Sequence, residues 1–315
     1  MSNLMTASRF PRLMDDRLTK AFENKLNAYA PKMIDTCYKV SSTDKMFDEY
    51  ADVEALPDIP EFNGTVAYIA NAPGYYTKIE QKEYAAAIQM ERKLVDFKRF
   101  AVMDARVENM AVSLNRTKEK KAARPFQNAF SAAFDMMSSE EGVSLCNTAH
   151  TTKVPGVSTS TGFSNSGTSA LSKTAIGAAR LAGKRFRMNN GELCNINLDT
   201  LIVPSSLYDT ACEATGYDPR TDVGSDLDPD SGQFKINVAR GIRVLEWTYL
   251  DDISTKSWFF VDFNAMKQFL LWNDSQKPDF KNRMDFNTFA IESSVYARFA
   301  YGFVAWNWIY GNQVS

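Results

Sequence analysis

Cys146 and His150 could form a nucleophilic pair, because the segment CNTAH places a thiol four positions from the one histidine of the chain. Such a pair is reactive when the thiolate and the imidazole lie within hydrogen-bond reach and a third group orients the imidazole. In a segment predicted to be a loop, this spacing secures neither condition. We therefore interpret His150 as a structural polar residue and not as a catalytic one.

Gly177, Gly183 and Lys184 superficially resemble a phosphate-binding loop. The motif has four residues between its glycines, whereas this segment has five, and Arg185 stands where the motif has the Ser or Thr that binds magnesium. A helical hydrophobic stripe also runs through the segment, made of Leu171, Ala175, Ala178 and Leu181. We expect a helix here and no nucleotide site.

Asp226, Asp228 and Asp230 alternate like the first ligands of a calcium-binding loop. Ser231 occupies the position of that loop's glycine, and Asn237 the position of its closing glutamate. A solvated acidic loop is therefore favoured over a bound metal. With these motifs set aside, the sequence predicts no catalytic, cofactor-binding or metal site, and no enzyme.

The charges are unevenly distributed along a chain whose formal net charge is -2. Residues 92–124 hold ten Lys/Arg against four Asp/Glu, whereas residues 217–232 hold five Asp against one Arg. A protein that mainly binds nucleic acid is usually basic overall, and the basic segment lacks interleaved stacking aromatics over most of its length. We interpret it as a solvated face or as a set of partner-directed salt bridges.

The cysteines form no CxxC pair, so neither a zinc site nor a disulfide framework is indicated. They are Cys37, Cys146, Cys194 and Cys212. The first residues lack the apolar run of a signal peptide, and no stretch reaches the ~20 apolar residues that span a bilayer. We expect a soluble chain that is not secreted, folds in a cytoplasm and has no membrane partner.

The aromatic segment 283–312 is the part of the chain around which the other elements are expected to fold. Its apolar residues recur at every second position, which predicts a strand through Val295, Ala297, Phe299, Tyr301 and Phe303. A second stripe predicts a long helix over residues 97–121, ended by Arg124-Pro125. Its members are Phe100, Met103, Val107, Met110 and Leu114.

Residues 143–275 alternate between strand and helix patterns, as in an inserted α/β or α+β domain. The expected elements are a helix capped by Thr168 or Ser169, a buried strand over 198–203, a helix ended by Gly216, strands near 234–247 and 257–262, and a helix over 265–272.

The first 95 residues contain elements with too little apolar surface to fold by themselves. An extended arm (1–15) precedes an amphipathic helix, formed by Leu18, Phe22, Leu26 and Tyr29, that must dock on another surface. Residues 46–95 read as a long two-stranded hairpin with an irregular tip and a return strand from Tyr84 to Met90. Such a hairpin is marginal in isolation and is expected to lie on a neighbouring surface. An ordinary surface loop over the chain's own core remains the alternative.

The order of these parts resembles that of the major capsid proteins of tailed bacteriophages, with the Hong Kong phage-type capsid fold. Several stretches are also similar to the Mu-like major head subunit branch. These are RLTKAFENKLNAY, FDEYADVEALPDIPEFNG, YYTKIEQKEYAAAIQMERK, GVSLCNTAH, LDTLIVPSSLYDTA and FNTFAIESSVYARFAYGFVAWNWIYGN, which together cover nearly the whole chain.

The resemblance implies an α+β fold in five parts. These are an N-arm (1–45), an extended E-loop (46–95, tip near 57–83), a spine helix and peripheral domain (96–142), an axial domain (143–275) and C-terminal peripheral strands (276–315). It also implies assembly contacts in the arm helix, the E-loop and the acidic loop. The candidate residues are Leu18, Phe22, Leu26, Tyr29, Pro57, Pro60, Phe62, Tyr75, Tyr76, Asp226, Asp228 and Asp230.

The function implied by the resemblance is that of a virion protein, assembled in the host cytoplasm as pentamers and hexamers of an icosahedral head. Its implied partners are further copies, scaffolding, portal and decoration proteins, and packaged double-stranded DNA bound without sequence specificity. No long charged helical segment precedes the arm, so a separate scaffold, or none, is expected. An encapsulin-like compartment shell protein and a tail or portal protein remain alternatives.

Two variants test this interpretation of the sequence. Deleting residues 57–83 is expected to leave a folded subunit that forms no closed shells. Phe22→Asp with Leu26→Asp is expected to block assembly while the mixed domain stays folded.

Overall fold

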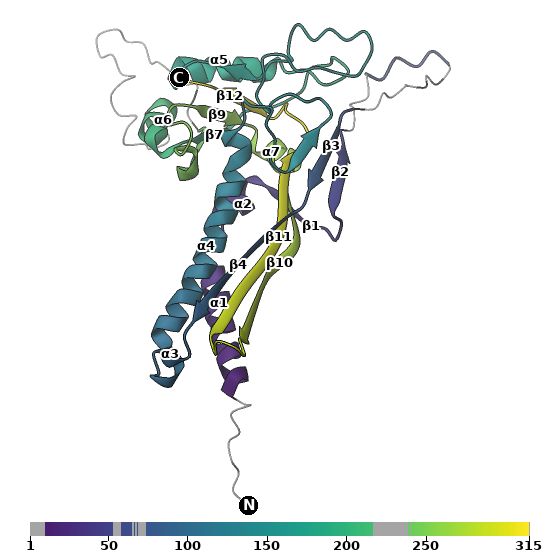
Figure 1. The fold of residues 1–315 in the computed structure, drawn as a ribbon. Coiled ribbons are helices and arrows are strands. Elements are labelled where there is room, and N and C mark those ends of the chain that lie inside the picture. Colours follow the sequence, from purple (N-terminus) through teal and green to yellow (C-terminus); the bar gives the residue numbers. More distant parts are fainter. Residues whose placement is uncertain are drawn as a thin grey trace, which may run out of the picture.

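A long helix lies along a long β-hairpin in the computed structural model, which describes residues 10–52, 58–64, 66, 68, 74–216, 239 and 241–314, with side chains from residue 16 onward. The helix is α4 (Phe100–Gln127), and the hairpin strands are β10 (Leu270–Met284) and β11 (Ile291–Phe303) (Figure 1). Met103 and Val107 of the predicted helical stripe are fully buried. The prediction of a long helix packed under the C-terminal strands is therefore confirmed.

The hairpin forms the middle of a four-stranded sheet with the order β1-β10-β11-β4. Strand β1 (Lys39–Ser42) pairs parallel with β10, and β4 (Lys82–Met90) pairs antiparallel with β11. Along β11 the side chains of Val295, Ala297 and Phe299 are buried, whereas Tyr296 and Arg298 between them are half-buried. The predicted period of two is thus present, because one face of the sheet packs on the core.

Asp135 joins α4 to this sheet through a cluster of charged and polar side chains. Its carboxylate accepts hydrogen bonds from Lys82 at 2.7 Å, Lys121 at 2.7 Å and the Tyr301 hydroxyl at 3.1 Å. Burial by itself raises the pKa of Asp135, but the hydrogen bonds from Lys121 and Lys82 outweigh it and hold that pKa well below its ordinary value. The cluster therefore stabilises the fold above the ordinary carboxyl pKa, and this contribution is lost as the pH falls through the lowered value.

The N-terminal helices α1 (Phe10–Ala28) and α2 (Lys32–Cys37) pack against α4 and the sheet of the same subunit. Leu18 and Phe22 are 2% and 1% exposed, and the Phe22 ring stacks on Phe280 of β10 with 4.6 Å between centroids. The sequence indicated that this helix must dock, but it assigned the docking to another subunit. The structure corrects that prediction for these two residues, since β10 supplies the covering surface within the chain.

A second, three-stranded sheet contains β2 (Phe47–Ala51), β3 (Tyr76–Glu80) and β5 (Met137–Ser139), in that order. The hairpin predicted over 46–95 therefore consists of β2 and β3. Its expected return strand is β4, which instead joins the sheet of β11 after a turn at Gln81. Ile79 of β3 and Met90 of β4 are both buried, and the Ile79 side chain lies against Gly302 of β11, where a Cβ would be 2.7 Å from its Cδ1.

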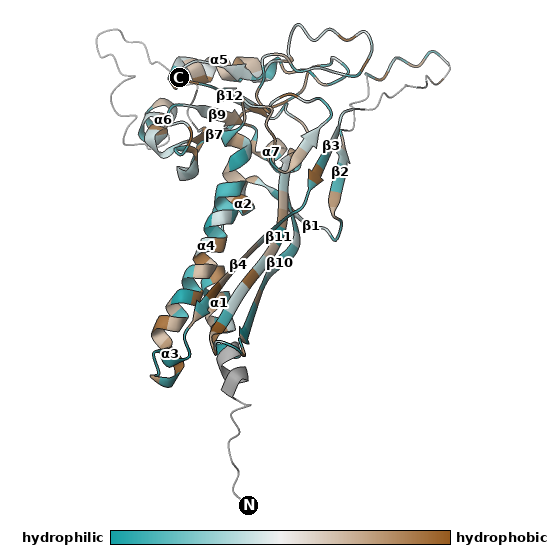
Figure 2. Ribbon diagram, in the orientation of Figure 1, coloured by the Kyte–Doolittle hydropathy of each residue, from teal (hydrophilic) through white to brown (hydrophobic). Residues whose placement is uncertain are grey.

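The inserted domain contains a five-stranded sheet with the order β6-β12-β9-β7-β8. The strands are β6 (Ser166–Gly167), β7 (Thr200–Val203), β8 (Arg243–Glu246), β9 (Trp258–Val261) and β12 (Ile309–Asn312). Every residue of β7 and β9 is buried, and Figure 2 shows the hydrophobic character of this region. Strand β12 pairs with β9, so the last strand lies in this sheet and not, as predicted, with the rest of residues 276–315 beside α4.

The remaining helices are short and include α3 (Lys93–Asp96), which precedes α4 in the chain. The others are α5 (Lys173–Lys184), α6 (Tyr208–Thr215), α7 (Phe263–Phe269) and the 3-10 turns η2 (Ser205–Leu207) and η3 (Thr248–Leu250). Gly216 ends α6 with a φ of +59°, as predicted from the αL preference of glycine. The predicted α5 segment is also helical, although Ser172, and not Thr168 or Ser169, caps it.

Two predicted helix ends are wrong for local physical reasons. Helix α4 continues through Pro125 to Gln127, because a proline in the last turn loses one backbone hydrogen bond and this one is buried against the core. Helix α7 begins after Asp262, whose carboxylate accepts hydrogen bonds from the backbone N–H groups of Asn264 and Ala265. It stops at Phe269, since the next residue already pairs in β10.

Candidate assembly interface

The arm, which we define as β2, β3 and the described residues between them (which include 58–64, 66 and 68), projects away from the helices of the subunit (Figure 1). Four large apolar side chains on its described part are 70% to 98% exposed, namely Ile59, Phe62, Val66 and Tyr68. Single exposed apolar residues are normal on soluble proteins, whereas several on one projecting segment mark a contact site. The apolar end of the arm is therefore the strongest candidate interface in the described part of the chain.

Of the site residues predicted for this segment, Pro60 and Phe62 lie on its exposed part, and Pro57 lies outside the described residues. Tyr75 and Tyr76 lie at the root, where Tyr75 is half-buried and Tyr76 is 51% exposed. The predicted contact residues therefore belong to two different places, the exposed part of the arm and its root. Ile59, Val66 and Tyr68 are more exposed than Phe62 but were not predicted as contact residues. The sequence signal that could have identified them is their apolar type within a turn-rich segment.

The root of the arm is held by polar contacts with Glu140 and with Thr151 and Lys153 of the inserted domain. The Tyr75 hydroxyl lies 2.7 Å from that of Thr151, and the Tyr76 N–H donates to Glu140 at 3.1 Å. Lys153 forms an ion pair with Glu140 and lies over both tyrosine rings, 5.2 Å and 5.5 Å from their centroids. The hydrogen bond from Lys153 is the main reason that the pKa of Glu140 is lowered. These contacts hold the root of the arm on the subunit.

A second exposed apolar group lies at the opposite end of the subunit, where α3 meets the turn between β10 and β11 (Figure 1). It contains Phe97, Met284, Phe286 and Phe289, which are 50% to 86% exposed. Phe289 has a φ of +52°, a conformation that bulky residues rarely adopt. From the sequence, Phe286 and Phe289 were placed in the aromatic segment 283–312 and Phe97 at the start of the predicted long helix, and no exposed surface was predicted there.

The other predicted assembly residues differ in their availability for contacts. Leu26 is half-buried, and Tyr29 is 57% exposed with Lys25 over its ring. The acidic residues Asp226, Asp228 and Asp230 lie outside the described residues. Because Leu18 and Phe22 are buried, Tyr29 is the predicted residue of helix α1 and its end whose side chain is mostly exposed.

His150 occupies a structural position, as predicted. Its ring is 1% exposed and stacks on Trp306, with 4.2 Å between centroids. Nδ1 lies 3.1 Å from Glu141 Oε1, and Nε2 lies 3.0 Å from Asn165 Oδ1. Cys146 makes none of these contacts, and burial raises the pKa of its thiol far above the ordinary value. The arrangement therefore positions loops and offers no activated nucleophile.

We expect His150→Ala to lower the free energy of unfolding by about 2–4 kcal/mol, because it leaves a cavity beside Trp306 and removes two buried hydrogen bonds. Denaturant unfolding of the subunit measures this effect. His150→Phe keeps the stacked ring but not the hydrogen bonds, so its free energy of unfolding should lie between those of the wild type and His150→Ala. An unchanged midpoint for His150→Ala would contradict the structural role.

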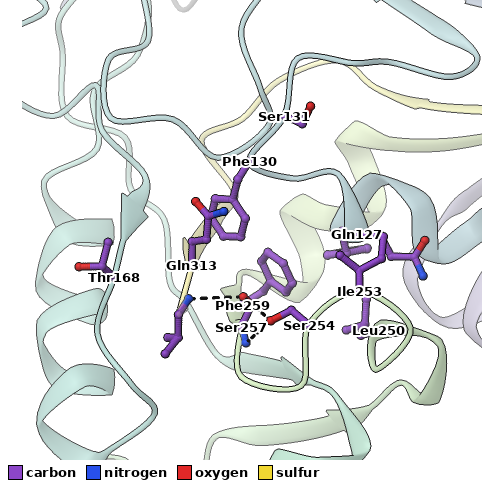
Figure 3. Close-up of a pocket in the computed structure, with 12 residues that line it drawn as sticks. Gln127, Phe130, Ser131, Thr168, Leu250, Ile253, Ser254, Ser257, Phe259 and Gln313 are labelled. Carbon is purple, nitrogen blue, oxygen red and sulfur yellow. Dashed lines mark hydrogen bonds between the residues drawn. The ribbon is translucent and has the colours of Figure 1, made fainter.

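A pocket of about 600 Å³ lies where α4 meets the inserted domain (Figure 3). Its apolar wall includes Phe130, Leu250 and Phe259, and Ser254 donates a hydrogen bond to Ser257 at 2.9 Å. None of its lining residues is acidic, basic, histidine or cysteine. The pocket therefore has no group to act as a general acid or base.

No group of three or more His, Cys, Asp or Glu side chains that could hold a metal ion occurs in the described residues. Within the same part of the chain, no helix has the length and apolar character needed to cross a membrane. The segment of Gly177 to Lys184 is helix α5, so the phosphate-loop reading is correctly rejected.

Comparison with known proteins identifies the family. The model of the phage capsid protein family matches residues 74–312. No curated protein matches the sequence significantly.

Solved structures with a similar fold include the procapsid of bacteriophage JBD30, with a TM-score of 0.52, 12% identity, and coverage of 98% of this chain and 76% of that one. The structure of Microbacterium phage Oxtober96 has a TM-score of 0.54 and 9% identity, and the match covers 89% of this chain and 90% of that one. The capsid of an empty GTA particle has a TM-score of 0.53 and 12% identity, with coverage of 91% of this chain and 90% of that one. Identities this low show similarity of fold, whereas the family match covers most of the chain. The protein therefore belongs to the phage capsid protein family and has the Hong Kong phage-type capsid fold.

Proposed function

We propose that this virion protein is the major subunit of the phage head, and that it closes an icosahedral shell of pentamers and hexamers through its projecting arm. The observation that carries the proposal is the exposure of Ile59, Phe62, Val66 and Tyr68 on a segment whose root is fixed. A two-stranded arm with exposed apolar residues gains stability when a neighbouring subunit covers it. In a closed shell every subunit offers its arm to a neighbour, so that all such surfaces are buried.

The chain is proposed to act without catalysis, because a shell subunit works through binding surfaces. The proposed partners are further copies of the chain, the packaged DNA, bound without sequence specificity, and scaffolding, portal and decoration proteins. Membership of the Mu-like branch stays a prediction from the sequence. The family match favours this function over an encapsulin-like compartment shell or a tail or portal component.

Expression of the full chain by itself tests the proposal. We expect closed particles, or rings of five and six subunits, in negative-stain electron microscopy, with a matching mass by light scattering. If a monomer is obtained, the neighbouring phage genes are co-expressed to supply a scaffold. A protein that stays monomeric in both preparations would contradict the proposed function.

A further inference from the structure

The acidic side chains of α4 lie on a different face from its solvent-exposed basic ones. The acidic ones point toward α1 and α2: Asp104 pairs with Arg17 at 2.5 Å, and Glu108 with Lys25 at 3.3 Å. Glu119 accepts a hydrogen bond from the backbone N–H of Met33 at 3.1 Å. Contacts within the subunit thus neutralise or occupy the carboxylates of this helix.

The basic side chains of α4 that face solvent form a separate group, the cationic stripe, which consists of Arg106, Arg116, Lys120 and Arg124. Spacings of ten, four and four residues place all of them on one side of a helix. Among the described residues, no carboxylate lies within 4.0 Å of any of the four. Two of the four contact neutral groups: Arg116 donates to the Ser113 hydroxyl at 3.5 Å, and Lys120 lies 5.8 Å from the Tyr249 ring centroid.

The stripe is straight and extends for about 27 Å, given a rise of 1.5 Å per residue. Three of its members are arginines, whose planar guanidinium groups bind phosphate with two hydrogen bonds. Residues 101–125 contain no aromatic side chain, so no aromatic ring of this helix lies among the members of the stripe to stack on unpaired bases. Duplex DNA needs no such stacking, because its affinity comes mainly from phosphate neutralisation.

We propose that the cationic stripe of α4 binds the phosphate backbone of duplex DNA, which places this face of the subunit toward the packaged genome. The inference rests on the proposed function, which supplies the DNA. It revises the interpretation of residues 92–124 from the sequence, where acidic and basic residues could not be assigned to different faces. A duplex is stiff and regularly charged, so it can contact the whole row at once, whereas a disordered acidic protein segment would lose conformational entropy on binding.

The test measures binding of the unassembled full-length protein to a 30-base-pair duplex by fluorescence anisotropy, from 50 to 300 mM NaCl. For four phosphate contacts we expect the logarithm of the binding constant to fall with the logarithm of the salt concentration with a slope of about -3.6. The variant R106Q/R116Q/K120Q/R124Q should bind at least about 10-fold more weakly at 50 mM, with a flatter slope. The matched control K20Q/R180Q/R185Q/K277Q removes four exposed charges elsewhere and should bind like the wild type.

Equal binding by the stripe variant and the control would overturn the inference. So would a wild-type protein that binds polyglutamate but not the duplex under the same conditions, since the stripe would then serve an acidic protein. Electron microscopy of the wild type and both variants distinguishes a failure of this inference from a failure of the proposed function. Shells that form normally with unaltered DNA binding refute the role of the stripe, whereas a wild type that forms no shells with its neighbouring genes refutes the proposed function.

Discussion

A subunit in which residues 53–73 are replaced by Gly-Ser-Gly folds normally but does not form closed shells. The described part of this segment holds the four exposed apolar side chains of the arm, and burying each in a neighbour contributes about 1.5–3 kcal/mol. The ends to be joined lie in contact, since a Cβ built on Gly74 would be 2.3 Å from the carbonyl oxygen of Asp52. A three-residue linker can therefore close the gap without disturbing β2 or β3.

Circular dichroism and thermal unfolding check that this variant folds, and electron microscopy with light scattering measures its assembly. A second variant keeps the loop length and changes Ile59, Phe62, Val66 and Tyr68 to Ser. Its control, Asp58→Asn with Glu61→Gln, alters two exposed neighbours of similar size and should assemble normally. Closed shells at wild-type yield from the shortened subunit would refute the role of the arm.

The structure also explains why the wider deletion of residues 57–83, suggested by the sequence, is the wrong experiment. That deletion removes β3, which pairs with both β2 and β5. It also removes Thr77 and Ile79, which are 1% and 0% exposed. The expected result is an unfolded subunit, which would say nothing about assembly.

Phe22→Asp lowers the stability of the isolated subunit by more than about 4 kcal/mol, because it creates a cavity and places a carboxylate in an apolar site. The Phe22 ring is stacked on Phe280, with an angle of 11° between the ring planes. The loss should release α1 from β10 and α4. Denaturant unfolding with a probe in the helical region measures it, and Phe22→Ala should show a loss of about 3–5 kcal/mol.

Lys20→Ala is the matched control for this prediction, because Lys20 lies on the same helix with an exposed side chain. A change within about 0.5 kcal/mol is expected for such a surface position. The sequence-based prediction was that Phe22→Asp together with Leu26→Asp blocks assembly and leaves the mixed domain folded. If the variant subunit unfolds like the wild type and only its shells are lost, that earlier interpretation is right and the packing described here is not.

The two predictions concern apolar residues that look alike in the sequence. Phe22 and Phe62 both lie in the first third of the chain, outside the segments that were assigned to the core. Their exposed fractions are 1% and 70%. The first stabilises a subunit by itself, whereas the second is available for a partner.

Local patterns in the sequence determined the helices and strands that have a clear apolar face or a clear end signal. The alternation through Val295 and Phe299 defined β11, and the stripe through Met103 and Val107 defined α4. Gly216 marked the end of α6. These features depend on backbone preferences and on which face of one element is apolar, and both can be read from a short stretch of chain.

The tertiary structure decided which surface covers each apolar face. That choice sent β4 to β11 instead of β2, returned β12 to the sheet of β9, and placed Phe22 on Phe280, 258 positions away. It also turned the acids of α4 toward α1 and left its arginines in solvent. The physical reason is that hydrophobic burial is non-directional: a sequence pattern states that a face must be covered, and only the packing of the whole chain determines by what.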